Sequence, residues 1–178
     1  VREIAAENAF LNARKRDSQD ICFVTGGKYA DFIENYTGKH YPSGDFTAED
    51  GTVLGRHRGL IRYTVGQRKG LGLALPAPLY VREKRAASNT VVLCPEERLY
   101  SRVLEARDIN LIAAERLDRP LRVAAKLRYT QEARAATVWQ TEEDALRVEF
   151  DEPQRAVARG QAVVLYDGDT VIGGGTIT

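Results

Sequence analysis

Apolar residues are spaced helically at the start of this chain and in short strand-like runs later. Residues 1–11 carry apolar side chains near helical spacing with charged residues between them, which predicts a helix. Residues 29–36 repeat the pattern at i, i+3, i+4 and i+7 before Gly38, as is typical of an amphipathic helix that ends at a glycine. Between them, the apolar run 21–24 precedes two glycines and predicts a brief buried strand.

The segment from Pro42 to Pro95 consists of short apolar runs separated by Gly, Asp and Asn. This turn-rich spacing favours strands over helices. Strands are expected at residues 52–54, 60–65, 79–82 and 90–93. A glycine-rich loop, Gly66–Gly72, separates two of them, and we interpret the segment as a small β-rich central domain.

Beyond Pro95 the apolar runs become longer and more regular, with turn residues between them. Six strands are expected here, at residues 102–106, 121–129, 135–140, 145–150, 161–166 and 170–177. Short strands at this spacing favour a closed antiparallel barrel, because closure leaves no exposed sheet edge. The predicted fold is mainly β: a β-rich central domain followed by a six-stranded antiparallel β-barrel, after a short helical remnant of a preceding α/β domain.

The expected division of the chain follows these changes in pattern. We assign residues 1–24 to the end of a preceding domain, 25–99 to the central domain and 100–178 to the barrel. The chain contains no Met and opens on Val1 inside a predicted helix, so we expect it to be a fragment. It lacks both the run of about twenty apolar residues that a membrane helix requires and a signal-peptide pattern. This predicts a soluble, cytoplasmic protein with no membrane partner.

The charged residues indicate a class of ligand in only one segment of the chain. Over the whole chain, 26 Lys and Arg balance 25 Asp and Glu, which is not the signature of a nucleic-acid-binding protein. The segment between Asp50 and Glu83, however, contains no acidic residue. Its basic residues are Arg56, Arg58, Arg62, Arg68, Lys69 and Arg82. A polyanion is therefore expected to bind along this segment.

The two cysteines, Cys22 and Cys94, are too few for a disulfide framework and have no metal-ligand spacing. Cys22 stands at the end of a predicted strand, with Lys15 and Arg16 upstream; nearby cations lower a thiol pKa and favour a reactive thiolate. A free cysteine that fills the core of a strand explains the same pattern and is favoured by composition alone. Cys94 follows three aliphatic residues and is interpreted as a buried strand residue without a role.

The glycine-rich loop presents Arg68 and Lys69 between glycines. It lacks the Gly-Lys-Ser/Thr ending that a nucleotide-binding P-loop requires. The two cations are expected either to contact RNA phosphates or to form a solvated turn, and the acid-free surroundings favour RNA. His40 and His57 have no second ligand at metal-binding spacing, so no metal site is expected.

The strand predicted near residues 121–130 alternates apolar and basic residues. One face is expected to carry Leu121, Val123, Ala125, Leu127 and Tyr129, and the other Arg122, Lys126 and Arg128. Such alternation is usual in a half-exposed strand. Aligned cations beside a tyrosine that can stack on an unpaired base make RNA a competing interpretation.

Several motifs together resemble the tRNA-specific 2-thiouridylases. Asp17–Val24 contains Ser-Gln-Asp-Ile-Cys-Phe, Gly55–Gly59 is Gly-Arg-His-Arg-Gly, and Tyr63–Gly72 contains Gly-Gln-Arg-Lys-Gly-Leu-Gly. The resemblance continues in the same order at residues 78–81, 126–129, 150–153, 160–161 and 173–175. It covers nearly the whole chain, and the first and third motifs are specific to that family.

The resemblance implies a sulfur-transfer role for Cys22. In that family an ATP-pyrophosphatase domain, marked by a Ser-Gly-Gly-x-Asp-Ser loop that is absent here, uses ATP with magnesium to adenylate the wobble uridine. The cysteine that matches Cys22 carries sulfur as a persulfide, and it forms a disulfide with a second cysteine that lies in the ATP-binding domain. The family's tRNA contacts correspond to Arg128, Tyr129 and Gln161; Lys126, Arg68 and Lys69 are our additions.

The expected activity is therefore that of a tRNA-uridine 2-sulfurtransferase in the full-length protein. The fragment alone is expected to be inactive and to bind no cofactor or metal. The implied partners are the anticodon arm of glutamate, glutamine and lysine tRNAs and a sulfur donor such as a cysteine desulfurase or a sulfur-relay protein. The alternative is a noncatalytic RNA-binding β-barrel module, which has no need of a reactive thiol at Cys22.

Overall fold

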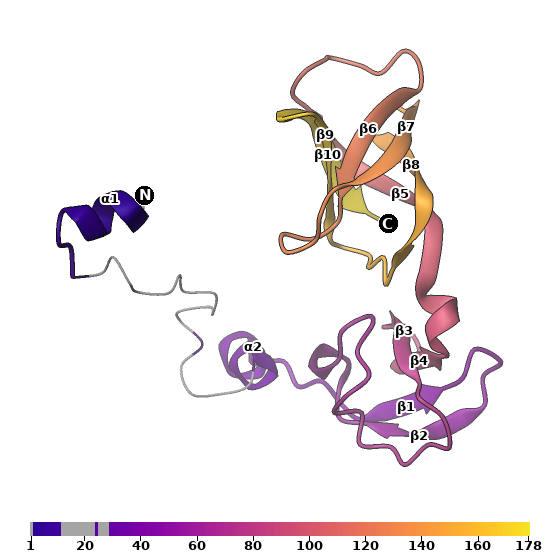
Figure 1. Ribbon diagram of the computed structural model, residues 1–178. Coiled ribbons are helices and arrows are strands. Elements are labelled where there is room, and N and C mark those ends of the chain that lie inside the picture. The colour runs from indigo at the N-terminus through magenta and orange to yellow at the C-terminus, as the bar shows by residue number, and fades with distance from the viewer. Residues whose placement is uncertain (1, 12–23, 25–28) are drawn as a thin grey trace. The chain divides into compact units, whose positions relative to one another are not determined.

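The computed structural model describes residues 2–11, 24 and 29–178, which fall into two compact units, 1–40 and 41–178. The first unit contains helix α1 (Arg2–Glu7) and helix α2 (Tyr29–Thr37) (Figure 1). The predicted amphipathic helix is confirmed by α2. It stops before Gly38, whose φ of +64° is a left-handed conformation that glycine adopts without strain.

A four-stranded sheet opens the second unit. Its strands are β1 (Gly44–Thr47), β2 (Val53–His57), β3 (Tyr80–Arg85) and β4 (Thr90–Cys94). Their order in the sheet is β2-β1-β4-β3, and only the pairing of β1 with β4 is parallel. The predicted β-rich character of this segment is confirmed.

One local prediction in this sheet is wrong, and one strand was not predicted. The strand expected at residues 60–65 is a short 3-10 helix, Leu60–Arg62, followed by irregular backbone. After this helix, the hydroxyl of buried Tyr63 accepts a hydrogen bond from the backbone N–H of Arg58 at 3.2 Å. Strand β1 was not expected, since Phe46 is its only large apolar side chain.

The core of the sheet is small and aromatic at one end. Its buried members are Phe46, Tyr63, Leu71, Val81, Val91 and Leu93. The imidazole of His57, 1% exposed, packs edge-on against Phe46 and Tyr63 with ring centroids 5.7 and 5.8 Å apart. His57 is therefore part of the core.

The predicted six-stranded barrel is confirmed (Figure 1). Its strands are β5 (Tyr100–Leu111), β6 (Leu121–Lys126), β7 (Arg134–Glu142), β8 (Ala145–Arg155), β9 (Ala162–Asp167) and β10 (Thr170–Ile177). They close in the order β10-β5-β8-β7-β6-β9, and every pairing is antiparallel. A short 3-10 helix, η2 (Glu96–Leu99), connects β4 to β5.

Strand β6 is shorter than predicted, and this changes the position of Tyr129. The strand ends at Lys126, and a turn closes where the backbone N–H of Gln131 donates to the carbonyl oxygen of Arg128 at 3.1 Å. Leu127 remains buried in the barrel core, but Tyr129 is 92% exposed. The expectation that Tyr129 continues the face of the strand formed by Leu121, Val123, Ala125 and Leu127 is therefore wrong.

Candidate nucleic-acid interface

Two connections meet at one end of the barrel (Figure 1). We call residues 127–131, which follow β6, the barrel turn, and residues 156–161, which connect β8 to β9, the β8–β9 loop. The guanidinium of half-buried Arg128 donates from Nη2 to the carbonyl oxygen of Ala156 at 2.7 Å. Gln131 donates to the side-chain oxygen of buried Gln154 at 3.0 Å. These bonds fix the barrel turn against the end of β8.

Tyr129 projects from this fixed turn into solvent. Its ring is 92% exposed, and the ammonium of Lys126 lies 5.8 Å from the ring centroid. A cation at this distance is attracted to the ring face. An exposed aromatic ring beside a positive charge can stack on a nucleobase while the cation contacts phosphate.

Gln161 stands at the foot of the β8–β9 loop, where backbone bonds hold it. Its N–H donates to Ala158 at 3.3 Å, and its carbonyl oxygen accepts from Ile177 at 2.8 Å. Its side-chain amide has no hydrogen-bond partner among the residues that the structure describes. Arg159, exposed in the same loop, was missed by the sequence analysis, because a single arginine between small residues gives no pattern.

Arg122 is not a free cation, contrary to the aligned row expected on β6. Its guanidinium bonds both carboxylate oxygens of Asp151, at 2.8 and 2.7 Å. The hydrogen bonds from Arg122 hold the pKa of the Asp151 carboxyl below its usual range. The remaining cations of the expected row are therefore Lys126, the last residue of β6, and Arg128 in the barrel turn.

The first residues of the glycine loop (Gly66–Gly72) are hydrogen-bonded to the edge of β3. The N–H of Gly66 donates to Val81 at 2.7 Å, and the N–H of Val81 donates to Gln67 at 2.9 Å. The side chain of Gln67 also accepts from the N–H of Thr64 and donates to the carbonyl of Lys69, both at 2.9 Å. Hydrogen bonds within the chain thus fix the conformation of this loop.

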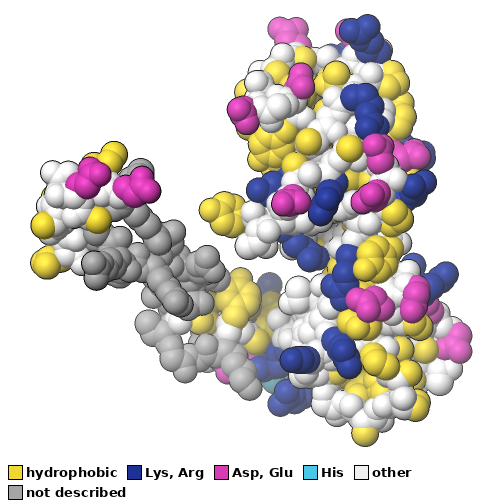
Figure 2. Space-filling model, in the orientation of Figure 1, with side chains coloured by type: hydrophobic (Ala, Val, Ile, Leu, Met, Phe, Trp, Pro, Cys, Tyr) yellow, Lys and Arg dark blue, Asp and Glu magenta, His cyan; other side chains and the backbone are white. Residues whose placement is uncertain are grey.

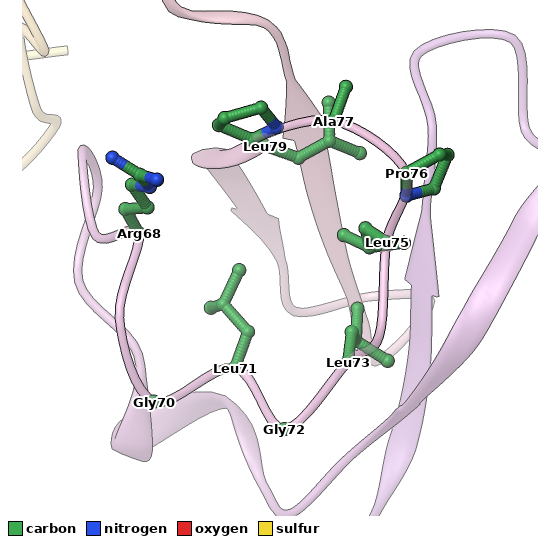
Figure 3. Close-up of a pocket in the computed structure, with 10 residues that line it drawn as sticks. Arg68, Gly70, Leu71, Gly72, Leu73, Leu75, Pro76, Ala77 and Leu79 are labelled. Carbon is green, nitrogen blue, oxygen red and sulfur yellow. The ribbon is translucent and has the colours of Figure 1, made fainter.

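Arg68 and Lys69 are exposed at the tip of this loop, and neither side chain has an ion-pair partner within the described part of the chain. Arg68 lies at the rim of a hollow of about 320 Å³ that Leu71, Leu73 and Leu75 also line (Figure 3). The position of the two cations is compatible with the expected phosphate contacts.

The loop does not fit a nucleotide triphosphate. It leads into irregular backbone instead of a helix, so no helix N-terminus is available there to hold phosphate. Within residues 2–11, 24 and 29–178, no group of three or more His, Cys, Asp or Glu could hold a metal ion.

The acid-free segment is partly neutralised in space by residues that precede it. Asp45 lies 3.3 Å from Arg56, and Glu49 pairs with Arg82. On the visible face of the molecule, Lys and Arg side chains are interspersed with Asp and Glu (Figure 2). The expected continuous basic segment is therefore reduced to separate cations, Arg68 and Lys69 among them.

The two cysteines differ in what the structure shows. Cys22 and its neighbours Lys15 and Arg16 lie outside the described residues. Cys94 is 1% exposed at the end of β4, and burial, assisted by the nearby charge of Glu49, raises the pKa of its thiol. A buried neutral thiol is a poor nucleophile, which agrees with the assignment of no role to Cys94.

Comparisons with known proteins support the resemblance seen in the motifs. The family model described as tRNA methyl transferase PRC-barrel domain matches residues 30–95, and the one described as aminomethyltransferase beta-barrel domain matches residues 101–177. The tRNA-specific 2-thiouridylase MnmA of Acetivibrio thermocellus is 50% identical over 99% of this chain and 49% of its own length. The chain belongs to the tRNA-specific 2-thiouridylase family.

Other members of this family match equally completely. The MnmA proteins of Moorella thermoacetica and Lachnoclostridium phytofermentans are 49% and 48% identical over 99% of the chain. The chain spans about half the length of these curated relatives. No helix in the described residues is long and apolar enough to cross a membrane.

Proposed function

We propose that this chain is the tRNA-binding and sulfur-carrying part of a sulfurtransferase that makes 2-thiouridine at the wobble position of tRNA. The observation that carries the proposal is the exposed ring of Tyr129 beside Arg128, whose guanidinium is anchored on Ala156, in a chain about half identical to 2-thiouridylases. An exposed tyrosine on a fixed turn serves base stacking better than it serves folding.

The described residues have different roles in the proposed tRNA binding. One arm of the Arg128 fork is bound to Ala156, which orients its remaining N–H groups for a phosphate or a base edge. Lys126, Arg68 and Lys69 contact phosphates, which sets affinity but not sequence preference. Gln161 offers an amide that can donate and accept. The ligand is the anticodon arm, and the family resemblance favours the glutamate, glutamine and lysine tRNAs.

Cys22 supplies the sulfur. Its persulfide, loaded by a cysteine desulfurase or a sulfur-relay protein, attacks C2 of the uridine with its outer sulfur, and the activated oxygen leaves. A second cysteine of the full-length protein then breaks the sulfur–sulfur bond and forms a disulfide with Cys22. Activation of the uridine with ATP and magnesium belongs to another domain, so the chain alone is inactive in thiolation.

Filter binding of tRNA at two salt concentrations tests the proposed interface. Lys126→Ala and Arg128→Ala are expected to weaken binding, and loss of one phosphate contact lowers the salt slope by about one. Arg116→Ala is a matched control, because Arg116 lies in the connection before β6 and Arg128 follows β6, at opposite ends of one strand. Equal losses in all three variants, or none in the first two, would contradict the proposal.

The rival function, a noncatalytic RNA-binding module, makes a different prediction for Cys22. If the chain only grips RNA, Cys22→Ser in the full-length protein leaves tRNA thiolation unchanged. If the proposal is right, thiolation is lost while tRNA affinity is retained.

A further inference from the structure

We propose that Arg155 is a positioning residue that holds the glycine loop and the barrel turn as one preformed RNA-binding face. The inference rests on the proposed function, because it concerns how the two sets of tRNA contacts are coupled. Arg155 ends β8 and lies beside the joint between the sheet and the barrel.

The first contact of Arg155 is with the connection η2. Its Nε donates to Glu96 at 3.2 Å, and its guanidinium carbon lies 5.3 Å from the ring centroid of Tyr80 on β3. The Tyr80 hydroxyl donates to the other carboxylate oxygen of Glu96 at 3.3 Å. One arginine at the end of β8 thus joins the barrel to the sheet through both an ion pair and a ring face.

The second contact is with the glycine loop itself. The Nη2 of Arg155 donates to the carbonyl oxygen of Gly66 at 3.4 Å. Gly66 has a φ of +87°, and a Cβ added there would lie 2.8 Å from the Cβ of Ala156. The loop therefore packs directly on the dipeptide Arg155–Ala156, with no space for a side chain at its first residue.

Ala156 completes the connection. Its N–H donates to the carbonyl of Leu99 at 2.9 Å, and its carbonyl accepts the guanidinium of Arg128 at 2.7 Å. Arg155 and Ala156 thus contact the base of the glycine loop, which carries Arg68 and Lys69. Ala156 also contacts Arg128 in the barrel turn. A displacement of Arg155–Ala156 would move both sets of cations relative to each other.

Arg155 itself is poorly placed to be another phosphate contact. Its side chain is 35% exposed; Nε and Nη2 already donate to Glu96 and Gly66, and the guanidinium lies over the Tyr80 ring. Its contribution is preorganisation: cations that are fixed before RNA arrives lose less conformational entropy on binding. A lysine has no planar fork and cannot make these contacts together.

Removal of the Glu96 carboxylate distinguishes a positioning role of Arg155 from a purely electrostatic effect on RNA binding. Loss of an acidic group near an RNA site strengthens binding if only electrostatics matter. If Glu96 holds Arg155, Glu96→Ala weakens tRNA binding several-fold instead. Glu97→Ala is the matched control, because Glu97 is the next residue of η2, is exposed, and makes no ion pair among the residues described; it is expected to leave binding unchanged or slightly stronger.

A double-mutant cycle tests the coupling. Lys69→Ala is expected to weaken tRNA binding several-fold in the parent chain but to have little effect in Arg155→Ala or Arg155→Lys, where the loop is no longer held against the barrel. Lys126→Ala on the barrel keeps its full effect in the same backgrounds. Circular dichroism checks that each variant is folded. If Arg155→Ala does not fold, the test is made with Arg155→Lys.

Three results would overturn the inference. They are tighter binding by Glu96→Ala, additive effects of Lys69→Ala and Arg155→Ala, and a fall of about one in the salt slope for Arg155→Ala, which is the mark of a direct phosphate contact. Failure of the proposed function is distinguishable, because then neither Lys69→Ala nor Lys126→Ala changes tRNA affinity in the parent chain.

Discussion

A ring nitrogen of His57 lies 3.0 Å from the carbonyl oxygen of Asn89. This contact joins the end of β2, where His57 lies, to the turn between β3 and β4. The other ring nitrogen, Nδ1, accepts the N–H of Gly59 at 3.0 Å. Since Nδ1 is an acceptor, Nε2 carries the proton and donates to Asn89, and the imidazole is neutral. His57 therefore serves the fold, although it lies inside one of the family motifs.

We expect His57→Ala to destabilise the sheet by about 2–4 kcal/mol, because it leaves a cavity and two unpaired backbone groups. Amide exchange should accelerate most in β1, β2 and β4. His40→Ala is the control, since the His40 side chain is 86% exposed and surface changes stay within about 0.5 kcal/mol. Unchanged exchange in the His57 variant would contradict this structural role.

Tyr129 is expected to contribute to RNA binding through its ring and not its hydroxyl. Tyr129→Ala should lose about 1–3 kcal/mol of affinity for an anticodon-arm RNA if the ring stacks on one base. Tyr129→Phe should bind almost as tightly, because it keeps the ring face and the cation of Lys126 beside it. Stability should be the same in both variants, since the side chain is 92% exposed. Equal loss in the two variants would indicate a hydrogen-bonding role instead.

The thiol of Cys94 should be protected by folding. In a Cys22→Ser chain, a disulfide reagent is expected to modify Cys94 only after denaturation, because the side chain is 1% exposed and burial raises its pKa. A raised pKa also gives a direction for stability. The contribution of the neutral thiol is fully present below its ordinary pKa of about 8.5 and is lost as pH rises through the folded value.

Urea unfolding at several pH values above neutrality checks this linkage. The parent chain should lose more stability with rising alkalinity than Cys94→Ala does, because only the parent must ionise a buried thiol. Rapid modification of Cys94 in the native Cys22→Ser chain would show that the thiol is accessible and would reopen the question of its role.

The barrel could be predicted from sequence because each strand buries one face and exposes the other. The burial of Val123, Ala125 and Leu127 on one side of β6 and its continuation follows the alternation directly. The helix over Tyr29–Thr37 was also predictable, since its apolar spacing and following glycine are local signals. Strand β1 was not, because it is a short strand stabilised by neighbours on both sides, and its partners lie elsewhere in the chain.

The candidate interface was predictable as a set of residue types but not as an arrangement. Lys126, Arg128 and Tyr129 lie close together in the sequence, so a motif could identify them. No local pattern reveals that Asp151 neutralises Arg122, or that Arg155 pairs with Glu96 across 59 residues of sequence. Ion pairs of this kind depend on strand register and on the joint between sheet and barrel, which the sequence specifies only through the complete fold.

Cys22 carries the most decisive prediction for the proposed chemistry. In the full-length protein, Cys22→Ser should abolish tRNA thiolation, because a serine hydroxyl cannot hold or pass on a sulfur atom. Binding of tRNA should be nearly unchanged, since the substitution replaces one atom and removes no phosphate contact. Cys94→Ser is the matched control and should remain active.

Mass spectrometry of the nucleosides from reacted tRNA measures the outcome directly, and filter binding of the same variants separates chemistry from affinity. Lost 2-thiouridine together with retained binding in Cys22→Ser, and normal product in Cys94→Ser, would place the sulfur on Cys22. Lys15 and Arg16, which precede Cys22 in the sequence, would favour its thiolate, so replacing both with Gln should slow sulfur loading from the donor without preventing it. A normal yield of 2-thiouridine from Cys22→Ser would refute the sulfur-carrying role and leave the chain as an RNA-binding module.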